Sequence, residues 1–154
     1  MLIKFDARHL VVLAGSLLAG AAQAANCSGY DVLVSQAAET LDLGGGHTLT
    51  VVRSHSMIVN DDTNAKDHLA IGECNGTLLN MPDKTSRGSG HCLRRDKDGD
   101  TYSLEWAIAA GADKGTWKTT GGTGKFARIS QSGWWQNAAG YGKVFANKWG
   151  GTCN

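Results

Sequence analysis

Four side chains near the middle of this chain carry groups that could act together on a small molecule: Glu73, Asn75, His91 and Trp106. A ligand pocket typically combines apolar walls with a few placed polar groups. Burial raises the pKa of a carboxyl and a neighbouring imidazolium lowers it, so a carboxyl and an imidazole can serve acid–base chemistry. We take these four as candidate ligand-binding residues. The alternative is that they hydrogen-bond to each other and to water near the rim of the fold.

Two turns decide where these side chains point. The segment around Asp83 contains the only proline of the chain and reads as a hairpin turn that sets Asn75 opposite His91. The dipeptide Asp98-Gly99 is a favoured two-residue turn, which sets His91 opposite Trp106. Because side chains alternate between the two faces of a strand, we expect the three polar groups to share an interior with the indole. A shift of one residue would reverse this assignment.

The acidic segment that holds the second turn also invites a calcium hypothesis. Asp96, Asp98 and Asp100 match the first carboxylates of an EF-hand loop, but the glycine and glutamate positions hold Thr101 and Ala107. A solvated hairpin turn is the better interpretation, and the three aspartates would be the ligands if a cation bound. We expect no cofactor. No serine lies in a nucleophile-elbow pattern, so we assign no catalytic residue.

All four cysteines, Cys27, Cys74, Cys92 and Cys153, follow a segment typical of export, and an even count there indicates disulfides. Cys74 and Cys92 each lie nine residues from Asp83, so the hairpin places them opposite each other. The other two lie near the ends of the mature chain. A bridge between them would tie the first strand to the last, and its long loop would contribute about 4–5 kcal/mol in the chain-entropy model.

Residues 1–24 read as a secretory signal. Lys4 and Arg8 precede an apolar run, and Ala22-Gln-Ala24 is a small-residue cleavage site. The apolar run is shorter than the roughly 20 residues that a membrane-spanning helix needs. We therefore expect an exported protein, periplasmic or extracellular, with a single domain over residues 25–154.

The mature chain is formally neutral. The signal holds two of the 15 basic and one of the 14 acidic residues, which leaves 13 of each. No basic patch or charge run stands out, which argues against nucleic acid and anionic membranes as partners. We expect a small apolar ligand or a protein partner, and no membrane insertion.

The mature chain reads as a series of strands separated by turns. We find no convincing helix; the one candidate for a helical turn is residues 35–41, within the first segment, 31–43, which the glycines 44–46 end. The strand-like segments that follow are 47–59, 68–81, 87–97, 101–110, 115–120, 125–135 and 141–149. About eight strands in a regular meander predict an all-β fold, either an up-and-down barrel or a sandwich. Because a barrel removes exposed strand edges, we expect a single antiparallel up-and-down barrel stabilised by disulfides.

A glycine-rich turn lies between two of these segments. Gly121, Gly122 and Gly124 separate the β-type runs 116–119 and 126–129. Because glycine tolerates positive φ without steric cost, we expect a tight reversal between antiparallel strands here.

This turn is part of an ordered set of short motifs across residues 72–149. The set comprises Cys74-Asn-Gly-Thr77, Gly90-His-Cys92, Asp96-Lys-Asp-Gly-Asp100, Glu105-Trp106, Gly115-Thr-Trp117, Gly121-Gly-Thr-Gly-Lys-Phe126 and Ser130–Gly133. The set resembles small exported bacterial β-barrel proteins related to the allene oxide cyclase-like and dirigent-like superfamily, a calycin-like group. Gln131 departs from the pattern, since a glycine is expected in that corner. The resemblance implies a barrel of unassigned activity.

Three functions are compatible with these observations. The first is a non-enzymatic exported barrel that binds a small apolar or amphipathic ligand or a partner protein. The second is a cyclase or isomerase of allene oxide cyclase type, which would hold a reactive substrate in the barrel and needs little sequence motif. The third is a structural or interaction module with a filled barrel. An open cavity would favour the first two.

Overall fold

The computed structural model describes residues 25–154. The predicted secretory signal, residues 1–24, lies outside the described residues. Across residues 25–154, the protein has no helix that is long and apolar enough to cross a membrane.

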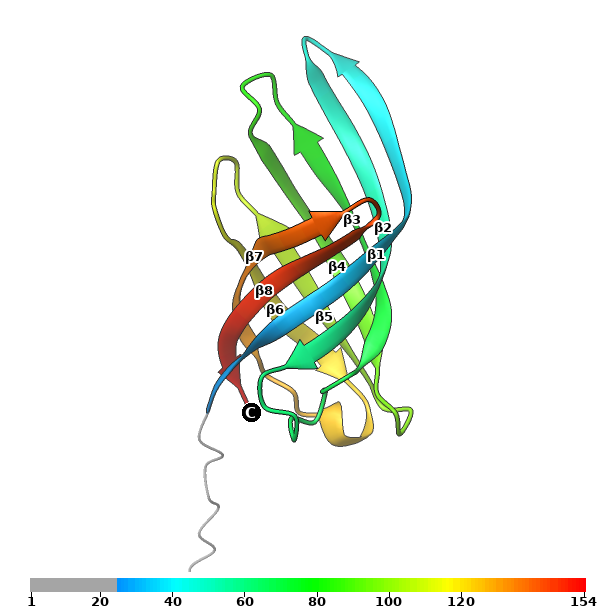
Figure 1. Ribbon diagram of the computed structural model, residues 1–154, viewed down its shortest axis with the longest axis vertical. Helices are drawn as coiled ribbons and strands as arrows, with labels where there is room; N and C mark the ends of the chain where they lie inside the picture. Colours follow the sequence, from blue (N-terminus) through cyan, green and yellow to red (C-terminus); the bar gives the residue numbers. More distant parts are fainter. Residues whose placement is uncertain (1–24) are drawn as a thin grey trace, which may run out of the picture.

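Eight antiparallel strands close into one barrel (Figure 1). Each strand pairs with the next in sequence, and the last pairs with the first. The strands are β1 (Ala25–Gly44), β2 (His47–Asn60), β3 (Ile71–Asn80), β4 (Ser86–Arg95), β5 (Thr101–Ile108), β6 (Gly115–Gly122), β7 (Ser132–Tyr141) and β8 (Val144–Cys153). One 3-10 turn, η1 (Gly124–Phe126), lies between β6 and β7. The predicted all-β up-and-down barrel is confirmed.

Alternation along each strand separates an interior from an exterior. In β5, Tyr102 and Leu104 are buried, whereas the intervening Ser103 is only half-buried. A period of two is what one buried sheet face imposes. Buried residues from several strands and loops meet in one core cluster: Leu33, Ala70, Cys74, Cys92, Tyr102, Leu104 and Phe126.

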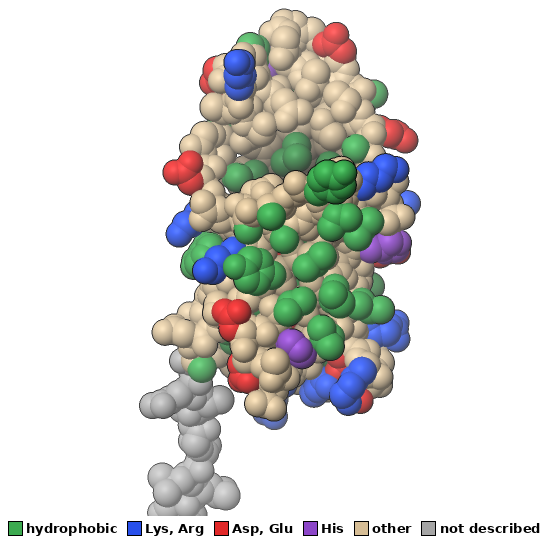
Figure 2. All heavy atoms as spheres, in the orientation of Figure 1, with side chains coloured by type: hydrophobic (Ala, Val, Ile, Leu, Met, Phe, Trp, Pro, Cys, Tyr) green, Lys and Arg blue, Asp and Glu red, His purple; other side chains and the backbone are tan. Residues whose placement is uncertain are grey.

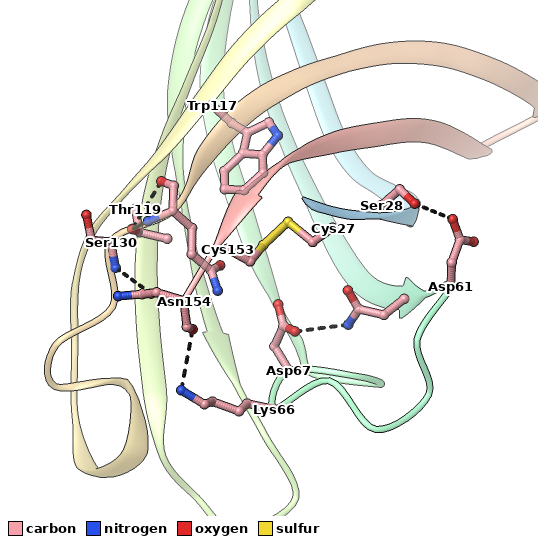
Figure 3. Close-up of a disulfide and its surroundings, with 12 residues drawn as sticks. Cys27, Ser28, Asp61, Lys66, Asp67, Trp117, Thr119, Ser130, Cys153 and Asn154 are labelled. Atoms are coloured by element: carbon pink, nitrogen blue, oxygen red, sulfur yellow. Dashed lines mark hydrogen bonds between the residues drawn. A yellow bond between two sulfur atoms is a disulfide. The ribbon is translucent and has the colours of Figure 1, made fainter. Parts of the chain in front are cut away.

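Both predicted disulfides are present. Cys74 and Cys92 are directly paired across β3 and β4, with Cα atoms 4.0 Å apart. Cys27 and Cys153 join β1 to β8 across the seam that closes the barrel (Figure 3). Backbone pairing runs along the same seam, so the first and last strands are tied both by hydrogen bonds and by a covalent bond.

The candidate helical turn at residues 35–41 is not formed, because this stretch belongs to the long strand β1. The register with β2 shifts between Ser35 and Ala37, which is a β-bulge or similar irregularity. A bulge adds one residue to a strand and bends it. The non-alternating composition that resembled a turn therefore reflects a bent strand.

The glycine-rich segment also differs from the prediction. Residues 126–129 do not form a strand; the chain passes through η1 and β7 begins at Ser132. Phe126, in η1, is 2% exposed and packs against Tyr102, with ring centroids 4.9 Å apart. Burial of this aromatic ring outweighs the strand propensity of the segment, because the ring plugs one end of the barrel.

The two ends of the barrel are built differently (Figure 1). At the lower end of the figure lie η1 and the loop between β2 and β3, and Ala70 of that loop is fully buried. At the upper end, the β1–β2 and β3–β4 hairpins extend past the short β7–β8 hairpin. We call the extended parts, residues 37–51 and 77–89, the arm.

A candidate ligand-binding cavity

The barrel interior contains a cavity of about 300 Å³. Its wall is formed mainly by inward-facing aromatic and aliphatic side chains. Four tryptophans, Trp106, Trp117, Trp135 and Trp149, line it together with Phe145. Figure 2 shows the hollow below the arm, with hydrophobic side chains inside it. Eight-stranded barrels have interiors that are either filled or large enough for one small ligand, and this one retains space.

The tryptophan rings are held in fixed orientations. Trp106 and Trp135 meet edge to face, with centroids 6.1 Å apart, and the interplanar angle between Trp117 and Trp149 is 90°. Edge-to-face contact is a preferred geometry for aromatic pairs. The indole N–H of Trp117 donates to the backbone oxygen of Trp134 at 3.1 Å. These contacts give the cavity a preorganised aromatic wall.

Two glycines make room for one of these rings. A Cβ on Gly76 would lie 2.3 Å from the Trp106 ring, and one on Gly90 would lie 2.6 Å from it. Both glycines face the interior in register with Trp106 across β3, β4 and β5. The Cys-Asn-Gly and Gly-His-Cys motifs therefore serve packing: their glycines leave space for a tryptophan on the neighbouring strand.

A buried ion pair lies in the cavity wall. Arg94 Nη2 donates to Asp31 Oδ2 at 2.5 Å, and the two side chains are 4% and 15% exposed. Burial raises the pKa of Asp31, and the Arg94 guanidinium opposes that rise. Burial also disfavours the charged guanidinium, but Asp31, Tyr102 and Asp67 outweigh it and raise the pKa of Arg94. Arg94 is therefore a permanent buried cation that must be matched by acidic and polar groups.

A small hydrogen-bond network surrounds this pair. Arg94 Nε donates to Ser56 Oγ at 3.2 Å, and the Tyr102 hydroxyl donates to Asp67 Oδ2 at 3.1 Å. Burial raises the pKa of Tyr102, so this phenol stays protonated at neutral pH. Within the described part of the chain, Asp31 Oδ1 and Trp149 Nε1 are buried without a hydrogen-bond partner. The wall thus holds one free acceptor and one free donor.

Of the four candidate residues from the sequence, the structure places only Trp106 in the cavity wall. Glu73, Asn75 and His91 lie on the outer face of the barrel and are exposed. Glu73 is near His55, with 3.9 Å between the carboxylate and the imidazole, and Asn75 accepts a hydrogen bond from Arg53. The expectation that the three polar groups point inward is wrong.

The first of the two turns was predicted correctly, and the second was not. Asn75 pairs with His91 as expected, but His91 pairs with Glu105 instead of Trp106. The turn after β4 has three residues between Asp96 and Asp100, whose backbones are hydrogen-bonded at 3.0 Å. Three-residue hairpin loops typically end with a residue in the left-handed region, here Gly99 with a φ of 91°. The extra residue shifts the register by one and exchanges the faces.

The acidic loop, residues 96–100, is paired with a lysine from the glycine-rich segment. The Lys125 ammonium contacts the carboxylates of Asp96 and Asp98, and the Lys125 backbone N–H donates to Asp100 Oδ2 at 3.1 Å. Lys125 lowers the pKa of Asp96 and, together with Lys97, that of Asp98 to about 2. The three aspartates of the calcium hypothesis are therefore engaged with the glycine-rich segment. No cluster of three metal-ligating side chains occurs among residues 25–154.

Sequence reasoning missed Asp31, Arg94 and three of the four tryptophans. One signal was available: the predicted bridge makes Cys74 and Cys92 point to the same face. If such a buried pair faces the interior, alternation sends Arg94 inward and His91 outward. The partner of Arg94 is 63 residues away along the chain, and no local pattern marks Asp31.

The comparisons with known proteins address the fold. No protein-family model and no curated protein matches the sequence. Among solved structures, a pterocarpan synthase dirigent protein is similar, with a TM-score of 0.52 at 10% sequence identity. The match covers 96% of this chain and 98% of the dirigent protein. The chain therefore has a dirigent-like fold, and at this identity the likeness is one of architecture alone.

Proposed function

We propose that this protein is an exported binding protein that holds a small apolar or amphipathic molecule with a ring inside its barrel. The observation that carries the proposal is the cavity of about 300 Å³ with four tryptophans in its wall. An apolar cavity of about 150 Å³ is known to accept benzene, so twice that volume accommodates roughly two fused rings.

Two further features support this function. The wall is preorganised, so binding a rigid ring would require little ordering of side chains. The buried atoms Asp31 Oδ1 and Trp149 Nε1 offer one acceptor and one donor to a polar group of the ligand. The dirigent protein with the similar fold is named as a synthase of a small molecule, pterocarpan, which agrees with a small-molecule role for the barrel.

Export is supported by the two disulfides, because such bonds persist in oxidising compartments. The signal-like segment 1–24 leads to the same proposal.

Calorimetric titration with β-naphthol tests the binding function. We expect saturable one-to-one binding in the micromolar to low-millimolar range. Val52→Trp fills the cavity from its rim and should weaken binding about tenfold or more. Val51→Trp is the matched control, since Val51 is the preceding residue on β2 and points outward, 42% exposed. Equal binding by both variants, or none by the unaltered protein, would refute the proposal.

A further inference from the structure

The arm has an inner face that none of the eight strands in residues 25–154 covers. β1 pairs with β8 only as far as Val34 and Val144, but continues its pairing with β2 to Gly44 and His47. The arm therefore rises past the short β7–β8 hairpin, as Figure 1 shows. Its inner face stands directly above the opening of the cavity.

The first inner positions above the rim are polar. Val52 and Leu78 line the cavity. Thr50 and Asn80 are the next inward-facing residues on the same two strands, since side chains of one face recur every second residue. Two residues of a strand span roughly 7 Å, a distance that one six-membered sugar ring covers.

These polar side chains form one connected array on the inner face. Asn80 Nδ2 donates to Thr48 Oγ1 and to Thr50 Oγ1, both at 3.1 Å. Ser86 Oγ donates to Asn80 Oδ1 at 2.8 Å. The hydroxyls of Thr40 and Thr50 are 3.2 Å apart. The array crosses all four strands of the arm and is held in place by its own hydrogen bonds.

The opposite face of the arm carries exposed apolar side chains beside polar ones such as Glu39, Thr77 and Arg87. Leu41, Leu43 and Val51 point outward and are 54%, 56% and 42% exposed. Exposure to solvent alone therefore does not make the arm polar, since exposed leucine and valine side chains lie on its outer face. In Figure 2, the side of the arm above the hollow is largely free of hydrophobic and charged side chains. The hydrogen-bonded polar array lies on the face that turns toward the cavity opening.

We infer that this array is a second subsite, which binds the neutral, hydroxyl-rich part of a ligand whose ring lies in the cavity. The inference rests on the proposed binding function and names the class of ligand: a neutral glycoside or polyol conjugate of a ring compound. Each threonine hydroxyl offers one donor and two acceptor positions, so the array retains capacity for ligand hydroxyls. The array consists of hydroxyl and amide groups, and the adjacent Asp42, which pairs with Thr48, adds a carboxylate to the same face. Recognition of phosphate or sulfate typically uses cationic side chains, so this face suits a neutral ligand.

Paired titrations with β-naphthol and its β-glucoside test this inference. We expect the glucoside to bind about tenfold more tightly, the gain that one or two added hydrogen bonds supply. Thr48→Val combined with Thr50→Val removes two hydroxyls with little change of shape. This variant should lose the advantage of the glucoside and keep the affinity for β-naphthol. Thr77→Val, on the outer face of β3, is the matched control and should change neither.

The outcomes separate the two proposals. If β-naphthol binds but the glucoside binds no more tightly, the second subsite is refuted and the cavity remains a binding site. If the glucoside keeps its advantage in the double variant, the array is not the subsite. If neither probe binds, the proposed function fails and the subsite fails with it. The sulfate ester of β-naphthol serves as an anionic probe. If this ester binds more tightly than the glucoside, the assignment of a neutral ligand is overturned.

Discussion

At the scale of single residues, the buried pair of Asp31 and Arg94 is the feature on which the interior depends most. A fully buried guanidinium is tolerated because it contacts a carboxylate and hydroxyl groups. The raised pKa of Asp31 means that the folded state holds this proton to a higher pH than the unfolded state. The contribution of Asp31 to stability therefore falls as the pH rises from 3.8 through the folded pKa.

This linkage gives a prediction for Arg94→Met. The substitution should cost about 3 kcal/mol at pH values near 8, because it leaves an uncompensated buried carboxylate. This loss of stability should become smaller toward about pH 3, where Asp31 is protonated in both the folded and the unfolded state. Arg95→Met, on the exposed neighbouring residue, should change the free energy of unfolding by less than about 0.5 kcal/mol. Denaturant unfolding at several pH values measures both, and a loss that does not vary with pH would contradict the account.

The residue scale also shows what the sequence could and could not predict. The proline-containing turn fixes the pairing of Cys74 with Cys92, and the observed register agrees. The next turn differs by one residue, and this single difference moved Glu73, Asn75 and His91 out of the barrel. Both a two-residue and a three-residue loop suit Asp98-Gly99. The three-residue loop is contacted by Lys125, 27 residues further along the chain, and no local pattern marks this contact.

At the scale of elements, the loop between β4 and β5 and the turn η1 form one unit. Lys125 of the glycine-rich segment contacts Asp96 and Asp98, while Phe126 closes the barrel beside Tyr102. The glycine-rich segment, which was predicted to be a strand reversal, therefore joins two loops at the end of the barrel where η1 lies. The arm at the open end is its counterpart: it is long, uncovered and polar toward the cavity.

Lys125→Met tests this unit. The pKa of Asp98 is lowered to about 2 and that of Asp96 is also lowered, mainly by Lys125. The two ionised carboxylates therefore stabilise the fold above pH 3.8, and this contribution is lost as the pH falls toward 2. The variant should melt several degrees below the unaltered protein at neutral pH, and the difference should close in acid. Lys143→Met in the exposed β7–β8 turn is the control. A difference that persists in acid would show that the lysine stabilises by packing alone.

At the scale of the whole molecule, closure of the barrel joins the two ends of the described chain, residues 25–154. The Cys27–Cys153 bond closes a loop of sequence separation 126, against 18 for Cys74–Cys92. The expected stabilisation is about 5 kcal/mol for the long loop and about 3 kcal/mol for the short one. The barrel and both bonds could be predicted from strand periodicity and cysteine spacing. The cavity could not, because its volume depends on how the tryptophans pack in three dimensions.

The variant with both Cys27 and Cys153 replaced by Ala should lose about 5 kcal/mol, a large part of the stability of a typical domain. The corresponding Cys74 and Cys92 variant should lose about 3 kcal/mol of loop entropy, plus the packing of two buried side chains. Urea unfolding without reductant measures both. A loss below about 2 kcal/mol from the first variant would mean that backbone pairing between β1 and β8 closes the barrel without help.

The most direct test of the binding cavity is a proton–nitrogen correlation spectrum of the indole groups during titration with β-naphthol. Four of the five tryptophans line the cavity, and the fifth, Trp134, lies outside it under the ammonium of Lys114. We expect the signals of Trp106, Trp117, Trp135 and Trp149 to shift with one common binding constant while the Trp134 signal stays in place. Shifts confined to Trp134, or no shift at saturating probe, would contradict a ligand site inside the barrel.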